Sequence, residues 1–109
     1  MLEKQKMILN LFGKWELTEQ EAANLLDLPL ERYYEFHLGE FENLNSELGN
    51  KVDELLRIHK ALRTLFDDPE RGYLWIRRPN TVFKGKIALE IMILNLKRVR
   101  IYLEAEVNG

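Results

Sequence analysis

The sequence predicts an all-α fold, and three observations lead to this prediction. Every long apolar segment has helical spacing, with apolar residues three or four positions apart. No alternation of polar and apolar residues reaches the length of a strand. Helix-start signals recur at Thr18, at Asn45 or Ser46, and at Asp68. We therefore expect about seven helices, with a helix-turn-helix N-terminal half packed on a C-terminal helical half.

Three helices are predicted in the N-terminal half. The first has apolar residues at helical spacing, namely Met7, Ile8, Leu11 and Phe12. It should end near Gly13. Thr18 then starts a short second helix, because Glu21 completes a capping box with it. A third helix begins at Pro29, a residue suited to the first helical position, and stops at Gly39. Its inward residues should be Tyr33, Phe36 and Leu38.

A polar linker, residues 40–45, separates these helices from a long helix capped by Asn45 or Ser46. The long helix has an apolar face made of Leu48, Val52, Leu55, His59, Leu62 and Phe66. Three further residues widen this face, namely Leu56, Ile58 and Leu65. The linker divides the chain into a helix-turn-helix-like subdomain, residues 1–45, and a second domain, residues 46–109. His59 is interpreted as a core histidine, since it lies on the apolar face.

Three helices follow the long one. Asp68 is predicted to cap the first, with Pro69 at its opening position and Glu70 favourable to its dipole. This helix should bury Tyr73, Leu74 and either Trp75 or Ile76. Pro79 and Asn80 end it. Residues 81–86 are predicted to be a loop, residues 87–94 a short apolar helix, and residues 96–107 the final helix.

The composition fits one globular protein with an uneven charge. The 109 residues are 46% hydrophobic and 31% charged, enough to fill a core and cover it. The absence of cysteine excludes disulfides, thiolate metal sites and cysteine nucleophiles. Residues 1–50 carry 4 basic and 10 acidic residues, net −6, whereas residues 51–109 carry 12 and 8, net +4. No apolar stretch approaches the roughly 20 residues of a membrane span. We expect a soluble, cytoplasmic protein without membrane contact.

Catalysis has little support in the sequence. The two histidines, His37 and His59, lie in different segments, and the chain lacks a glycine-rich phosphate loop and paired carboxylates with a matching base. The acidic cluster at Asp67, Asp68 and Glu70 is explained by helix capping before Pro69, so no metal site is expected. Trp15 and Trp75 are interpreted as core residues. The prediction is a protein that is not an enzyme and needs no cofactor.

The segment from Thr18 to Leu38 has the helix, short turn and helix of a helix-turn-helix unit. Asp27 stands where such turns often have glycine, and it tolerates left-handed geometry. On the second helix the candidate DNA-contacting residues are Arg32, Tyr34 and His37. Glu31 also points outward, and the half carries net −6, which should repel DNA. We expect DNA binding only weakly or as a complex with a partner; a small DNA-binding transcriptional regulator is the alternative function.

The C-terminal half resembles the toxin-binding domain of the Xre/MbcA/ParS family of bacterial antitoxins. That domain typically has a leucine-rich helix, then D-P-E-x-A-x-x-W-L, a P-N loop closed by glycines, and P-L-E before a final helix. The matching positions here are Asp68, Pro69, Glu70, Trp75, Pro79, Asn80, Gly85, Leu89 and Glu90. Three positions depart from the pattern: Thr81 and Ala88 stand where prolines are common, and Lys84 replaces one glycine of a frequent pair.

This resemblance implies an antitoxin that covers the active site of a RES-type toxin, an NAD-consuming enzyme. The expected toxin-binding residues are Arg77, Arg78, Pro79, Asn80, Phe83, Lys84, Lys86 and Arg98. Phe83 has two interpretations, because an aromatic on a cationic loop suits an interface, but it can equally pack on its own domain. We also expect a homodimer, since the long apolar face and residues 91–94 hold more apolar surface than a small domain buries.

Overall fold

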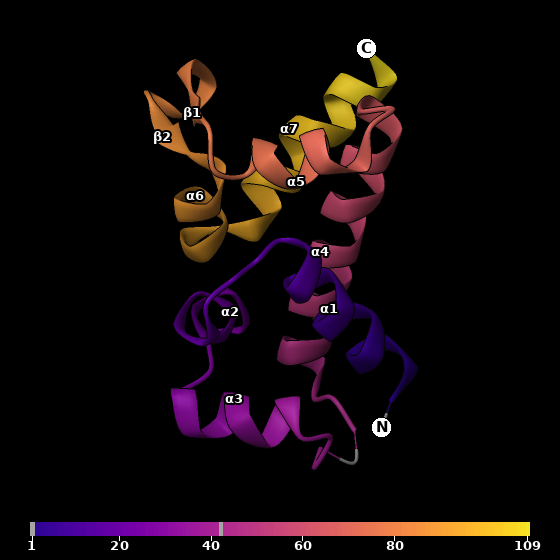
Figure 1. The fold of residues 1–109 in the computed structure, drawn as a ribbon, viewed down its shortest axis with the longest axis vertical. Helices are drawn as coiled ribbons and strands as arrows, with labels where there is room; N and C mark the ends of the chain where they lie inside the picture. Colours follow the sequence, from indigo (N-terminus) through magenta and orange to yellow (C-terminus); the bar gives the residue numbers. More distant parts are fainter. Residues whose placement is uncertain (1, 42) are drawn as a thin grey trace. The chain divides into compact units, whose positions relative to one another are not determined.

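The computed structural model describes residues 2–41 and 43–109, and these form seven α-helices and one two-stranded sheet (Figure 1). The predicted all-α fold is therefore confirmed. The chain forms two compact units, residues 1–53 and residues 54–109, so the division between them lies inside the long helix. The sequence placed its domain boundary at the linker before that helix, and independent folding of residues 1–45 and 46–109 stays a prediction.

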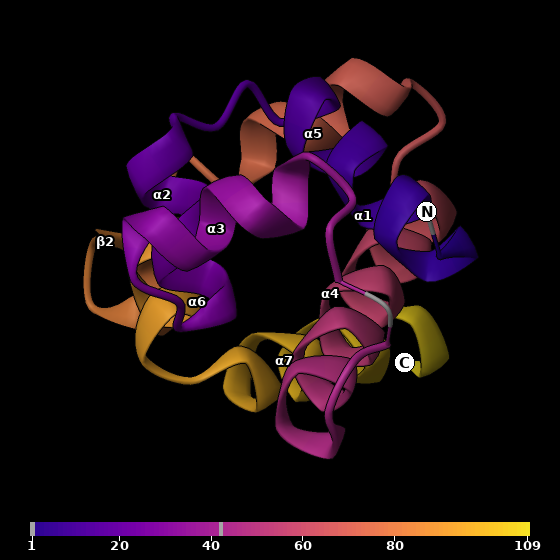
Figure 2. The same cartoon turned by 90° about the horizontal axis from the view of Figure 1, so that it is seen from below.

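The first unit contains α1 (Glu3–Lys14), α2 (Glu19–Leu26), α3 (Leu30–His37) and the start of α4. The predicted capping box is present, because Thr18 Oγ1 accepts from the Glu21 amide and Glu21 Oε1 accepts from the Thr18 amide. Asp27 adopts the left-handed conformation expected of it, with φ of 54°. Residues 27–29 separate α2 from α3, which lie side by side (Figures 1 and 2).

Buried side chains from each helix fill the first unit. They include Ile8, Leu11, Phe12, Trp15, Ala23, Leu25, Leu26, Tyr33 and Phe36. The fully buried Gln5 amide donates a hydrogen bond to the Phe36 carbonyl and so ties α1 to α3. Two expectations for α3 were wrong. Pro29 precedes the helix instead of opening it, and Leu38 is 69% exposed because the helix has already ended at His37.

The long helix α4 (Ser46–Leu65) begins after Asn45, whose Oδ1 accepts from the Leu48 amide at 2.8 Å. Asn45 is therefore the cap of the two candidates. The predicted apolar face is largely correct, since its aliphatic members Leu48, Val52, Leu55 and Leu62 are buried. Leu65 was wrongly assigned to this face and is exposed.

The second unit continues with α5 (Pro69–Trp75), a short hairpin, α6 (Ala88–Leu94) and α7 (Leu96–Asn108). Asp68 caps α5 as predicted, with its Oδ1 accepting from the Glu70 amide at 3.0 Å. Two expectations fail here. Leu74 is 52% exposed, because Gly72 and Ile76 face the interior instead. Residues 81–86 are not a plain loop: residues 81–85 form the turn of a hairpin, and Lys86 begins its second strand.

The prediction of a homodimer rests on an excess of apolar surface over what one copy of the chain can bury. In the structure, most of that surface is buried within the single chain. The aliphatic residues of the α4 face are buried within the single chain, and so are Ile91 and Met92. Of residues 91–94, only Ile93 and Leu94 are exposed. Homodimer formation stays a prediction. None of the described helices is both long enough and apolar enough to cross a membrane.

Candidate functional site: a cationic hairpin on an aromatic support

The hairpin consists of β1 (Pro79–Asn80), a 3-10 turn (Thr81–Phe83) and β2 (Lys86–Ile87). The strands are antiparallel, with Pro79 opposite Ile87 and Asn80 opposite Lys86. Asn80 organises the turn, since its Oδ1 accepts from the Val82 amide at 3.0 Å and its carbonyl accepts from the Gly85 amide at 2.9 Å. The hairpin is therefore a hydrogen-bonded structure with a defined shape.

The chain reverses at Lys84 and Gly85, which both have left-handed backbone angles, with φ of 56° and 83°. Glycine adopts this conformation without steric cost, whereas a residue with a Cβ does so at a cost of about 1 kcal/mol. This explains physically why a glycine pair suits this position. Lys84 adopts this unfavourable backbone conformation and places a cation at the tip of the hairpin.

The base of the hairpin is fixed to the core of the second unit. The Leu89 amide donates to the Ile76 carbonyl at 2.9 Å, which joins the residue after α5 to the first turn of α6. Both side chains are buried. The two ends of residues 77–88 are thus held together, and the hairpin projects from this junction (Figure 1).

An aromatic cluster supports the hairpin from below. Phe83 is 2% exposed, and its ring meets Trp75 and Tyr102 edge-on, with centroid distances of 6.3 and 5.8 Å. Trp75 and Tyr102 stack on each other at 6.3 Å with planes 8° apart. The Arg98 guanidinium lies 5.5 Å from the Phe83 ring centroid. Of the two interpretations of Phe83, packing on its own domain is the one observed. Trp75 is half-buried in the same cluster.

The hairpin carries exposed cations at one end of the second unit. Arg78, Lys84 and Lys86 come from the hairpin segment, and Lys97 and Arg98 come from the first turn of α7. In the described part of the chain, these five side chains form no ion pair. The other expected toxin-binding residues lie beside them: Arg77 and Pro79 are exposed, and Asn80 is half-buried. The only exposed apolar side chain of the turn is Val82, at 41%, which sequence reasoning missed.

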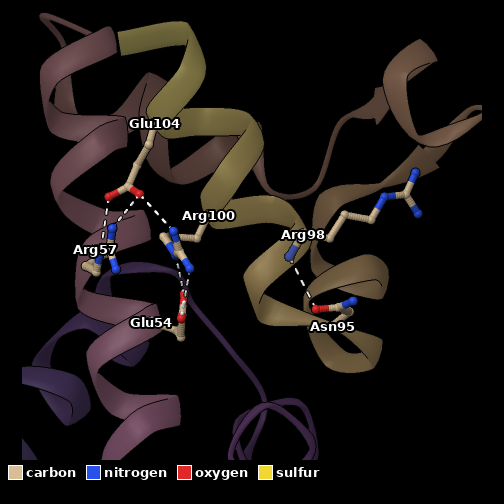
Figure 3. A network of polar contacts seen from close by, with 6 residues as sticks. All are labelled: Glu54, Arg57, Asn95, Arg98, Arg100 and Glu104. Atoms are coloured by element: carbon tan, nitrogen blue, oxygen red, sulfur yellow. Dashed lines mark hydrogen bonds and ion pairs between the residues drawn. The ribbon is translucent and has the colours of Figure 1, made fainter. Parts of the chain in front are cut away.

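A four-residue ion-pair network fixes α7 to α4 (Figure 3). Arg100 Nε and Nη2 donate to both oxygens of Glu54, at 2.6 and 3.2 Å. Glu104 accepts from Arg100 at 3.1 Å and from Arg57 at 2.7 Å. The hydrogen bond from Arg57 lowers the pKa of Glu104, and the bond to Glu54 raises the pKa of Arg100. Sequence reasoning missed this network, although Glu54 and Arg57, like Arg100 and Glu104, are one helical turn apart.

A groove of about 300 Å³ opens beside this network, at the ends of α4 and α7. Its lining mixes charged and apolar residues, including Arg57, Lys60, Glu104 and Val107. None of the residues expected to bind toxin or DNA lines it. Within residues 2–41 and 43–109, no group of three potential ligands is placed to hold a metal ion.

The residues expected to contact DNA are placed on or beside α3 but are partly engaged within the first unit. Arg32 pairs with Glu35, and its guanidinium lies 4.4 Å above the Phe41 ring. Tyr34 is exposed, and a hydrogen bond with Glu19 raises its pKa. His37 is exposed, with its ring centroid 6.0 Å from that of Tyr33. The helix therefore offers few uncommitted donors.

Comparisons with known proteins match the C-terminal part of the chain to one protein family. Residues 61–109 match the family model described as "Antitoxin Xre/MbcA/ParS C-terminal toxin-binding domain". "Uncharacterized protein y4oB" from Sinorhizobium fredii (strain NBRC 101917 / NGR234) is 34% identical over 100 residues, which cover 88% of this chain and 78% of that protein. No solved structure matches the chain.

The fold and the matched region define a class of small helical proteins that carry a toxin-binding domain. Residues 61–109 of the chain belong to the Xre/MbcA/ParS antitoxin C-terminal toxin-binding domain family. The hairpin, its aromatic support and α7 all lie inside the matched region, residues 61–109. Family membership supports an antitoxin role in a toxin–antitoxin system and suggests that the protein acts by binding rather than by catalysis.

Proposed function

We propose that this protein is the antitoxin of a type II toxin–antitoxin system and neutralises a RES-type, NAD-consuming toxin by covering its active site. The covering elements are the hairpin, residues 79–87, and helix α7. The observation that carries this proposal is the position of the hairpin. It lies within the residues that match the toxin-binding domain, and its cations Lys84 and Lys86 are exposed and form no ion pair among the described residues.

The proposed contact residues divide into three roles. The cations Arg77, Arg78, Lys84, Lys86 and Arg98 meet acidic groups around the toxin's cleft. Pro79 and Asn80 hold the hairpin in shape, as the hydrogen bonds of Asn80 indicate. Phe83 supports the hairpin from inside, because a buried ring cannot enter a pocket of the partner without leaving its own cluster.

Val82 then takes the role that the sequence suggested for Phe83. Its side chain is exposed on the turn that also carries Lys84, and covering a partly exposed aliphatic side chain contributes favourably to the free energy of binding. Covering the methyl groups of Val82 should contribute about 1 kcal/mol to toxin binding. Each exposed cation should contribute about 0–1 kcal/mol.

The test uses two double variants with the same change in net charge. The hairpin variant combines Lys84→Gly with Lys86→Gln, and the glycine relaxes the left-handed backbone at residue 84. The control variant combines Arg63→Gln with Arg71→Gln. Both arginines are exposed and lie outside the hairpin, in the last turn of α4 and the first turn of α5.

Each variant is co-expressed with its cognate toxin, and the purified complex is assayed for NAD consumption and for affinity. We expect the wild type and the control variant to inhibit equally. The hairpin variant should bind more weakly, by up to about 2 kcal/mol or roughly thirtyfold, if both cations pair with the toxin. If the hairpin variant binds and inhibits at wild-type strength, the hairpin is not the inhibitory element.

The alternative function, transcriptional regulation through α2 and α3, has one specific observation in its favour. The two helices are joined by a short turn with left-handed Asp27, which is the arrangement expected of a helix-turn-helix unit. Its test is binding of the purified protein to its own promoter. Nanomolar affinity at about 0.15 M salt, where specific DNA-binding proteins remain bound, would favour the regulator.

A further inference from the structure

The two compact units of the chain carry opposite net charges. Residues 1–53 contain 5 basic and 11 acidic residues, net −6, and residues 54–109 contain 11 and 7, net +4. An anionic polymer that approaches this protein is therefore attracted by the second unit and repelled by the first. Helix α3 lies in the first unit, which repels the polymer, whereas DNA reading by α3 would require attraction to that unit.

The positive charge of the second unit is concentrated rather than dispersed. Five residues, here called the hairpin cations, form the concentration: Arg78, Lys84, Lys86, Lys97 and Arg98. All five are exposed, and among the described residues none has an acidic partner. The contact of Arg98 with Phe83 brings the start of α7 against the hairpin. Arg57 and Arg100, by contrast, are neutralised by Glu54 and Glu104.

These cations are held on a rigid base. The backbone pairing of Asn80 with Lys86, the Leu89 to Ile76 hydrogen bond and the aromatic cluster fix the hairpin. The backbone that carries these cations therefore loses little conformational freedom when their side chains meet a row of phosphates. Phosphate contacts supply most of the affinity of sequence-independent DNA binding.

The aromatic cluster argues for duplex rather than single-stranded nucleic acid. Single-strand binding proteins offer open aromatic faces on which bases stack. Here Phe83 is buried, and Trp75 and Tyr102 stack on each other. The strands of the hairpin, two residues each, are also too short to lie along a groove and read bases. The surface is suited to phosphates alone.

We propose that the hairpin cations bind the phosphate backbone of duplex DNA without sequence preference. DNA therefore engages the second unit of the protein and not α3, where Arg32 is already paired with Glu35. The proposal does not depend on the identity of the toxin. Four of these cations, Arg78, Lys84, Lys86 and Arg98, also carry the proposed toxin contact. Toxin and DNA therefore compete for one surface.

The experiment measures binding of the full-length protein, without toxin, to labelled duplexes of two unrelated sequences. Fluorescence anisotropy is recorded between about 0.05 and 0.2 M KCl, the range in which phosphate contacts dominate the salt dependence. Five phosphate contacts give a slope of about −4.5 for log affinity against log salt. The hairpin variant should reduce the steepness of this slope by about 2 and weaken binding at low salt by tenfold or more.

The control variant changes net charge equally and should leave the slope unchanged. Arg32→Gln, on α3, should also leave it unchanged. Thermal melts of each variant confirm that it is folded. Equal losses in the hairpin and control variants would overturn the proposal, because net charge alone would then explain binding. A loss caused by Arg32→Gln, an affinity that differs between the two duplexes, or no wild-type binding at the lowest salt would also overturn it.

Toxin binding by the same variants separates this proposal from the proposed function. If the hairpin variant loses toxin but binds DNA as the wild type does, the surface is a protein interface and the DNA proposal is wrong. If it loses DNA but still binds toxin fully, the DNA proposal stands and the toxin contact lies elsewhere.

Discussion

Replacing Phe83 with alanine removes the ring on which the hairpin rests. In the structure this ring is 2% exposed and touches Trp75, Tyr102 and the Arg98 guanidinium. Phe83→Ala therefore leaves a cavity beneath the hairpin and removes the contact that holds Arg98 against it. The primary effect should be on stability, and the effect on toxin binding should follow from a disordered hairpin.

The magnitude follows from the buried area of the ring. A buried aromatic side chain removes about 150–250 Å² from water, worth roughly 4–6 kcal/mol as an upper value. Alanine retains the Cβ, and measured Phe→Ala substitutions in cores cost about 3–5 kcal/mol. The hairpin lies at the edge of its unit and can collapse partly, so we expect about 3 kcal/mol. For a chain of this size that corresponds to a fall in Tm of roughly 12–24 °C.

Urea denaturation followed by circular dichroism measures the loss, and Val82→Ala is the matched control. Val82 is the neighbouring residue in the same 3-10 turn but is exposed, so its substitution should cost less than about 0.5 kcal/mol of stability. If Val82 contacts the toxin directly, Val82→Ala should weaken the complex while the stability of the free protein is kept. A Phe83→Ala protein as stable as Val82→Ala would refute the argument that the ring is structural.

Four further substitutions test other features of the second unit. Gly72→Ala should stabilise the protein by about 0.5–1 kcal/mol, because a Cβ there would meet Leu62 Cβ at 3.5 Å, an ordinary contact, within helix α5; a lower Tm in calorimetry would contradict this. Lys84→Gly should stabilise by up to about 1 kcal/mol by relieving left-handed strain, and a destabilised variant in urea melts would show that the lysine has a structural role. Arg100→Ala should cost about 1.5–3 kcal/mol, since its 13% exposed side chain holds Glu54 by two bonds. Arg57→Ala should cost under about 1 kcal/mol, because Arg57 is 52% exposed. If urea denaturation gave the same loss of stability for Arg57→Ala and Arg100→Ala, burial would not explain the strength of the Arg100 pair.

Local chemistry explains why most helix boundaries were predictable. The Thr18 and Glu21 capping box and the Asp68 cap depend only on residues within one turn of each other. The left-handed turn at Asp27 is similarly local. The sequence singled out Arg77, Arg78, Lys84 and Lys86 because they lie close together within residues 77–86, but it did not assign Lys97 to the site. Their role in toxin binding stays a prediction. Arg98 joins them in space only through its contact with Phe83.

The edges of apolar faces were less predictable. Leu38, Leu65 and Leu74 all have helical spacing with buried residues, yet all are exposed. Periodicity gives the direction of a helix face but not how far the neighbouring elements extend over it. Each of these residues lies in the last two residues of its helix or just beyond, where the covering elements end.

The sequence by itself determined the all-α class, the helix caps, the charge asymmetry and the antitoxin family, because all of these are recorded in residues close together along the chain. Tertiary structure decided whether Phe83 faces a partner or its own core, and it assembled the Arg100–Glu54 pair from residues 46 positions apart. Such contacts depend on how α4, α5 and α7 pack in the second unit. No local pattern specifies that packing, because each segment has the residues to form its helix whether or not its side chains contact those of another helix.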